Sequence, residues 1–116
     1  MTHEEKKVGK IIEELTMFFF AIGADKITTG IEKREKQVII DFKANYDSAY
    51  SDRLERLQQY MNEEKNEGME DIYWELAGSG DPGETSQLLL IGMMIDKADV
   101  CIKDNTVELR LYKEML

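Results

Sequence analysis

Three glycines give this sequence its one candidate for phosphate chemistry. Gly78, Gly80 and Gly83 follow the spacing G-x-G-x-x-G, and an apolar run begins shortly after them. A glycine-rich turn of this kind can bring backbone N–H groups close to a nucleotide phosphate where a helix begins. The dinucleotide fingerprint, however, places its first glycine directly after a strand, and the segment before Gly78 has helical periodicity. The spacing alone is therefore weak evidence for a nucleotide site.

The same stretch is also explained as the start of a buried helix. Asp81 is a favourable N-cap, Pro82 suits the first helical position, and Glu84 completes a capping box. Both carboxylates would repel a phosphate from the amides at that helix start. We favour the interpretation that this stretch only begins a helix, and we keep residual binding of a nucleotide or small anion by Gly78, Gly80 and Gly83 as the alternative.

Other reactive side chains are few. His3 is the only histidine and stands near the chain start, where a general base would lack a held geometry. Cys101 is the only cysteine, so no internal disulfide forms, and no histidine or cationic cluster near it in the sequence would activate its thiol. Neighbouring acids such as Glu13 and Glu14 point apart on a helix. We expect no catalytic residues, no metal site and no cofactor, and hence no enzyme.

The length and charge of the chain limit its domain number and its possible partners. The chain has 116 residues and 42% hydrophobic residues, which suits one domain spanning residues 1–116. It carries 24 acidic and 15 basic residues, and a net charge of −9 repels nucleic-acid backbones and anionic lipids. Its apolar runs fall well short of the ~20 residues that cross a bilayer. We expect no nucleic-acid partner, no membrane association and a cytoplasmic location.

The first segment of the chain has the apolar periodicity of a helix. Thr2 and Glu5 have the T-x-x-E form of a capping box, and Gly23 suits a helix end. Met17 and Phe20 widen the apolar stripe until the last turns are apolar nearly all round, so something beyond a one-sided core is expected to cover them. The residues at helical spacing are Val8, Ile11, Ile12, Leu15, Phe18, Phe19 and Ile22.

Alternation of period two predicts two β-hairpins. The first spans about residues 25–43, and the second spans about residues 98–113 with a tight turn at Asp104–Asn105. Between the hairpins the spacing predicts a helix capped by Ser51 or Asp52, a short helix over residues 69–76, and the helix after Pro82.

Each hairpin follows an apolar helix end and an Ala-Asp pair, so an αββ unit occurs twice. This order, αββ-αα-αββ, predicts an α+β two-layer sandwich with a four-stranded, mostly antiparallel sheet and helices on one face. The outer sheet face should be polar, yet Ile39, Cys101 and Tyr112 fall on it. These three residues, with Trp74 on the short helix, are the candidate partner surface, although Trp74 also suits a core.

The order of helix, two strands, insert, glycines, helix and two strands resembles the histidine-kinase-like ATPases, the family of gyrase, MutL and the sensor kinases. The resemblance implies that Gly78, Gly80 and Gly83 match the phosphate-binding glycines of that family. The position of the family's metal-binding asparagine holds Phe20, and "DFKANYDSAYSD" lacks the glycines of the segment that reads adenine. The resemblance therefore implies a degenerate fold without the Mg²⁺ ligand that hydrolysis requires.

The chain has more apolar surface than one core needs, and we expect no catalytic or metal-binding residues in it; together these lead to one functional expectation. The chain should be a non-catalytic regulatory or protein-interaction module that associates with itself, as a homodimer, or with another protein. The alternative is a residual nucleotide-binding or small-anion-binding protein without hydrolysis.

Overall fold

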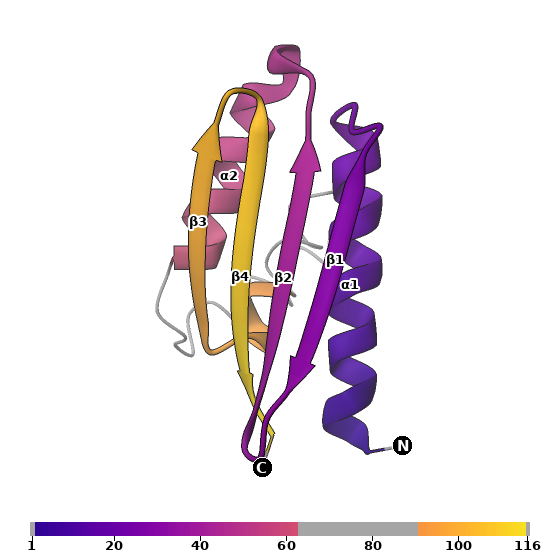
Figure 1. Ribbon diagram of the computed structural model, residues 1–116. Coiled ribbons are helices and arrows are strands. Elements are labelled where there is room, and N and C mark those ends of the chain that lie inside the picture. The colour runs from indigo at the N-terminus through magenta and orange to yellow at the C-terminus, as the bar shows by residue number, and fades with distance from the viewer. Residues whose placement is uncertain (1, 63–90, 116) are drawn as a thin grey trace, which may run out of the picture.

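The computed structural model describes residues 2–62 and 91–115 and gives them an α+β fold (Figure 1). One antiparallel sheet has the strand order β1-β2-β4-β3. Two hairpins thus meet along β2 and β4, and the predicted antiparallel sheet of four strands is confirmed. The elements are α1 (His3–Ala21), β1 (Ile27–Lys33), β2 (Gln37–Asn45), the 3₁₀ turn η1 (Ser48–Tyr50), α2 (Ser51–Asn62), β3 (Lys97–Lys103) and β4 (Thr106–Glu114).

The ends of α1 are those that its sequence predicts. The Thr2 hydroxyl accepts a hydrogen bond from the Glu5 N–H, and the Glu5 carboxylate accepts one from the Thr2 N–H, each over 3.1 Å. These bonds satisfy amides that a helix start leaves unpaired. At the other end the chain leaves the helix at Gly23, whose φ is +91°. A Cβ at Gly23 would lie 2.8 Å from the Cβ of Asp47, so this turn has no room for a side chain.

The hairpin between β3 and β4 turns on two residues. Asp104 and Asn105 have φ values of +53° and +58°, and Lys103 pairs with Thr106 across them. Two successive residues with positive φ match the twist of the flanking strands, which is the geometry of a type I′ turn. The predicted turn position is confirmed.

The start of α2 differs from the prediction. The 3₁₀ turn η1 precedes the helix, and Asp47 caps that turn by accepting a hydrogen bond from the Ala49 N–H over 3.0 Å. Ser51 instead donates its hydroxyl to the Ser48 carbonyl over 2.7 Å. The helical segment therefore begins earlier, because Asp47 has the extended backbone that an N-cap needs. The predicted short helix over residues 69–76 lies outside the described residues.

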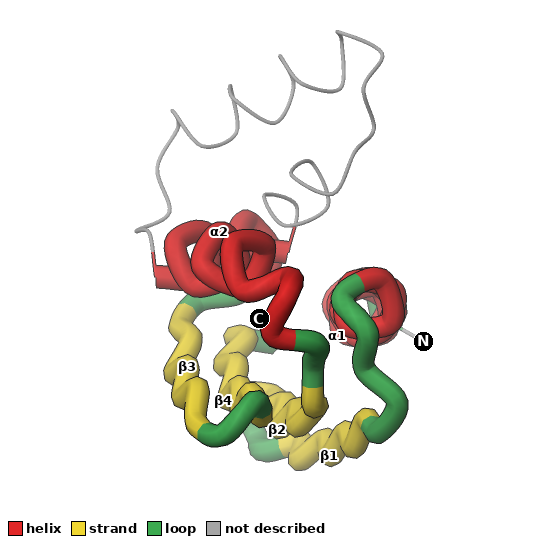
Figure 2. Tube along the Cα trace, turned by 90° about the horizontal axis from the view of Figure 1, so that it is seen from above, coloured by secondary structure: helices red, strands yellow, loops and turns green. Residues whose placement is uncertain are grey.

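The core lies between the sheet and its helices. Figure 2 shows α1 and α2 on the same side of the sheet, with α2 over the side of β3 and α1 over the side of β1 and β2. Phe19 stacks on Phe42 at 5.2 Å between ring centroids, and Phe18 meets Phe19 edge-on at 5.3 Å. Both hairpins contribute buried side chains to this core, which include Ile40, Phe42, Ala44, Val107, Leu109 and Leu111.

Two charged residues of α1 also lie on its inner side. Glu4 forms an ion pair at 2.8 Å with Lys113, whose side chain is buried on the helix side of β4. Glu14 is only 8% exposed, and among the described residues its Oε2 atom has no hydrogen-bond partner. Its Oε1 atom binds Lys10 at 2.8 Å. Glu14 lies one position before Leu15, so the core side of α1 is wider than its apolar stripe.

Among the described residues, no helix is both long enough and apolar enough to cross a membrane.

Candidate functional site

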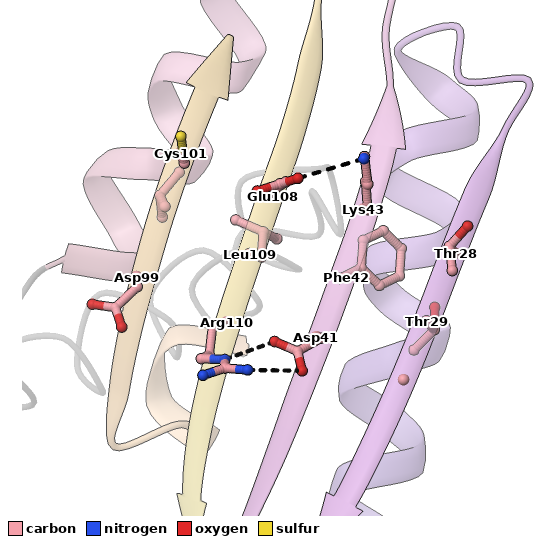
Figure 3. A pocket seen from close by; sticks show the side chains of 12 residues that line it. Thr28, Thr29, Asp41, Phe42, Lys43, Asp99, Cys101, Glu108, Leu109 and Arg110 are labelled. Carbon is pink, nitrogen blue, oxygen red and sulfur yellow. Dashed lines mark hydrogen bonds and ion pairs between the residues drawn. The ribbon is translucent and has the colours of Figure 1, made fainter.

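The sheet face opposite α1 and α2 carries no helix in the described part of the chain (Figure 2). Polar side chains fill this open face, as its outward positions predict. Strands β1, β2, β3 and β4 together form a shallow hollow of about 580 Å³ on it (Figure 3). The exposed polar residues of the face include Thr28, Asp41, Lys43, Asp99, Lys103, Glu108 and Arg110.

Cross-strand ion pairs organise the floor of the hollow. Asp41 and Arg110 are register partners on β2 and β4, and the guanidinium donates to both carboxylate oxygens at 2.8 and 3.3 Å. These hydrogen bonds lower the pKa of Asp41 below its usual range. Two register positions along, on the same face, the Lys43 ammonium lies 3.5 Å from the Glu108 carboxylate (Figure 3). The hollow thus presents alternating charges that already neutralise each other.

The predicted partner residues of this face differ in exposure. Ile39 is only 2% exposed, because it lies between its register partners Glu32 and Tyr112 on the neighbouring strands. It therefore offers almost no surface to a partner. Tyr112 is half-buried, donates its hydroxyl to Asp99 over 3.3 Å, and lies under the ammonium of Lys97 at 5.3 Å from the ring centroid.

Cys101 is exposed and contributes to the lining of the hollow. It pairs in register with Glu108, whose carboxylate is also near Lys43. No group of three or more histidine, cysteine, aspartate or glutamate side chains within the described ranges could hold a metal ion. Polar recognition of another surface is the chemistry that this face supports best.

The remaining predicted site residues cannot be placed beside this face. Gly78, Gly80 and Gly83, and with them Trp74, lie outside the described residues.

Elements α1 and β1 also carry exposed apolar side chains. Met17, Phe20 and Ile31 are 58%, 60% and 57% exposed. The sequence predicts that something beyond a one-sided core covers Met17 and Phe20, and the single chain leaves both more than half exposed. The exposure of Ile31 is not predicted, because the alternation of its strand places Ile31 with the core residues. We call the three residues the α1–β1 surface.

Ile31 is exposed because β1 is an edge strand. It lies in register with buried Ile40, so its side chain is on the helix side of the sheet, but β1 has no neighbour beyond it in the described sheet. Beside Ile31 a groove of about 260 Å³ follows α1, where Gly9 leaves open space. The polar residues Thr28 and Thr29 and the flanking Gly30 are the sequence signal for such a poorly covered strand.

No family model, curated protein or solved structure matches this chain. Inference of its function therefore depends on the residues themselves.

Proposed function

We propose that this protein is a non-catalytic protein-interaction module that associates with itself as a homodimer. The observation that carries the proposal is the α1–β1 surface, in which Met17, Phe20 and Ile31 are each more than half exposed. Full burial of one such side chain contributes about 1.5–3 kcal/mol. Large apolar side chains that are this exposed are candidates for burial against a partner.

The charge of the chain supports a protein partner over an anionic one. A net charge of −9 opposes binding to nucleic acid and to anionic membranes. Within the α1–β1 region the balance is different, since residues 2–34 contain six acidic and six basic side chains. Two copies can therefore approach each other at this region without net repulsion. An exposed free thiol at Cys101 fits a reducing compartment, and we place the protein in the cytoplasm.

The relation to histidine-kinase-like ATPases is part of the same proposal. Phe20 stands where that family has its metal-binding asparagine, and its ring is 60% exposed. A phenyl ring has no oxygen with which to bind Mg²⁺. This supports the loss of hydrolysis in a chain of that fold, with regulation through protein contacts in its place.

Gel filtration with light scattering tests the self-association. We expect a dimer whose fraction rises with protein concentration, and replacement of Phe20 by serine should shift the equilibrium toward the monomer. Replacement of Tyr50, which is 37% exposed on η1, by serine is the matched control and should leave the mass unchanged. A strictly monomeric species at millimolar protein would contradict the proposal.

Nucleotide binding is the second candidate, and the spacing of Gly78, Gly80 and Gly83 is the observation that favours it. A ligand that binds only the native state raises the melting temperature. ATP and ADP, each with and without Mg²⁺, would be compared with sodium sulfate at matched ionic strength. A rise specific to nucleotide would support this candidate, and the absence of a rise at millimolar nucleotide would exclude it.

A further inference from the structure

The free edge of the sheet at β1 is shaped to pair with a copy of itself. Every residue of β1 from Thr28 to Lys33 is exposed, and α1 lies to one side of the strand rather than across its edge (Figure 2). The strand contains no proline, and an exposed edge of this length is a template for another strand. The opposite edge strand, β3, packs beside α2.

Hydrogen-bond parity shows which groups of β1 are free to pair. Lys26 accepts a bond from Asn45 of β2 through its carbonyl, and Arg34 donates its N–H to Gln37. Because bonding alternates along an antiparallel strand, the even-numbered residues of β1 bond to β2. The odd-numbered residues direct their N–H and C=O groups away from the sheet. These residues are Ile27, Thr29, Ile31 and Lys33.

We propose that two copies pair antiparallel through β1, about a two-fold axis at Thr29, and form one continuous sheet. This inference rests on the proposed self-association and names its interface. About that axis Thr29 lies opposite the second copy's Thr29, and Ile27 lies opposite its Ile31. Both pairs join odd-numbered residues, whose free N–H and C=O groups then bond across the interface.

The side chains are complementary in this register. The two isoleucine pairs lie on the helix side of the sheet, where Ile31 is 57% exposed in the single chain. Thr29 pairs with Thr29, and Gly30 lies opposite Thr28 on the open face. Beyond them Lys26 lies opposite Glu32 and Asp25 lies opposite Lys33, so that both charged pairs join opposite signs. Opposite charges and apolar pairs stabilise cross-strand contacts.

Charge complementarity favours a second copy over an unrelated extended peptide. In the two-fold register each acidic residue of the edge meets a basic one, and each isoleucine meets an isoleucine. A slip that moves the axis by three residues, from Thr29 to Glu32, would instead place Glu32 opposite the second copy's Glu32. Such repulsion across strands is destabilising, so the complementary register has a clear advantage.

Disulfide trapping tests the register directly. In a Cys101→Ser background, one protein carries Thr28→Cys and a second carries Gly30→Cys; a Cβ at Gly30 meets nothing within 4 Å. Directly opposite residues of a pair without hydrogen bonds have Cα atoms about 4.5 Å apart, which a disulfide can span. Diagonal neighbours are about 7–8 Å apart, which is too far. Mild oxidation of the mixed proteins should therefore give a mixed disulfide dimer, and each protein alone is the matched control that should not cross-link.

A backbone variant gives an independent test. Thr29→Pro removes an N–H that the fold of one chain does not use, and Pro is tolerated on edge strands. The dimer should weaken at least about tenfold, because both copies lose a bond at the axis. Circular dichroism would check that the variant remains folded. If Thr29→Pro does not fold, the disulfide-trapping experiment still tests the interface.

The outcomes separate this inference from the proposed self-association. Mixed cross-linking together with dimer loss in Thr29→Pro supports the interface. A dimer by light scattering that gives no mixed cross-link overturns the interface and leaves self-association in place. If Gly30→Cys cross-links with itself and the mixture gives no mixed disulfide, the axis at Thr29 is overturned. A protein that remains monomeric at millimolar concentration overturns both, and selective capture of an unrelated extended peptide by the edge of that monomer would identify a different occupant.

Discussion

Gly23 shows how one residue decides where α1 ends. Its φ of +91° is strained for any residue with a side chain, and a Cβ there would overlap that of Asp47. Gly23→Ala should therefore lower the free energy of unfolding by about 2 kcal/mol or more. Urea denaturation would measure the loss.

Gly9 is the matched control for that substitution. It lies within α1 and has open space around its Cα, so Gly9→Ala should raise the free energy of unfolding by roughly 0.5–1 kcal/mol. Equal effects at both glycines would contradict the account of the turn.

The ion pair of Asp41 and Arg110 gives a pH dependence with a definite sign. Arg110 lowers the pKa of Asp41 in the folded chain, so the pair stabilises the fold at neutral pH. Both side chains are half exposed, which limits the contribution to less than about 1 kcal/mol. Asp41→Asn should be less stable than the parent at neutral pH. The difference should shrink as the pH falls below about 4 and the parent carboxylate becomes protonated.

Urea midpoints at several pH values would check this. Lys43→Gln alters the neighbouring ion pair of the same face and is the control. Its stability difference from the parent should not shrink in the same way on acidification, because this variant keeps the Asp41–Arg110 pair. A difference that grows on acidification would contradict the assignment.

At the scale of elements, Lys113 and Glu4 connect β4 to α1. Glu4→Ala would leave the ammonium of Lys113 buried without its 2.8 Å partner, and removing one member of a buried pair is costly. Lys113→Met keeps the volume and leaves Glu4 near Lys7 at 3.2 Å. Glu4→Ala should therefore lower the thermal midpoint more than Lys113→Met. The reverse order would mean that apolar packing of the Lys113 chain matters more than its charge.

The turn at Asp104–Asn105 orders the second hairpin. Asn105 has a φ of +58°, where asparagine and glycine are tolerated far better than alanine. Asn105→Ala should cost about 1 kcal/mol of stability, whereas Asn105→Gly should be neutral or stabilising. Thermal unfolding of both variants distinguishes them, and equal midpoints would argue against the turn as a determinant of the hairpin.

Elements whose signal is local could be predicted from the sequence. The capping box at Thr2 and Glu5, the end at Gly23 and the Asp104–Asn105 turn each depend on neighbouring residues, and each is confirmed. The burial of Glu14, Ile39 and Lys113 and the exposure of Ile31 could not be predicted, because these depend on which strands and helices become neighbours. Strand order carries that information, and periodicity along one strand does not.

The candidate site also has one part that the sequence predicts and one part that it does not. The polar open face follows from alternation, whereas its ion pair of Asp41 and Arg110 needs the register of β2 against β4. At the scale of the whole molecule, the edge role of β1 makes Ile31 a partner residue instead of a core residue.

Amide hydrogen exchange on β1 tests the proposed interface most directly. In a single chain the N–H groups of Ile27, Thr29, Ile31 and Lys33 face away from the sheet, whereas those of Thr28 and Gly30 bond to β2. Raising the protein concentration until dimers predominate should slow exchange at the odd-numbered amides and leave Thr28 and Gly30 as internal controls. Fast exchange at Thr29 and Ile31 in a sample whose mass is twice 13.5 kDa would contradict pairing through this edge.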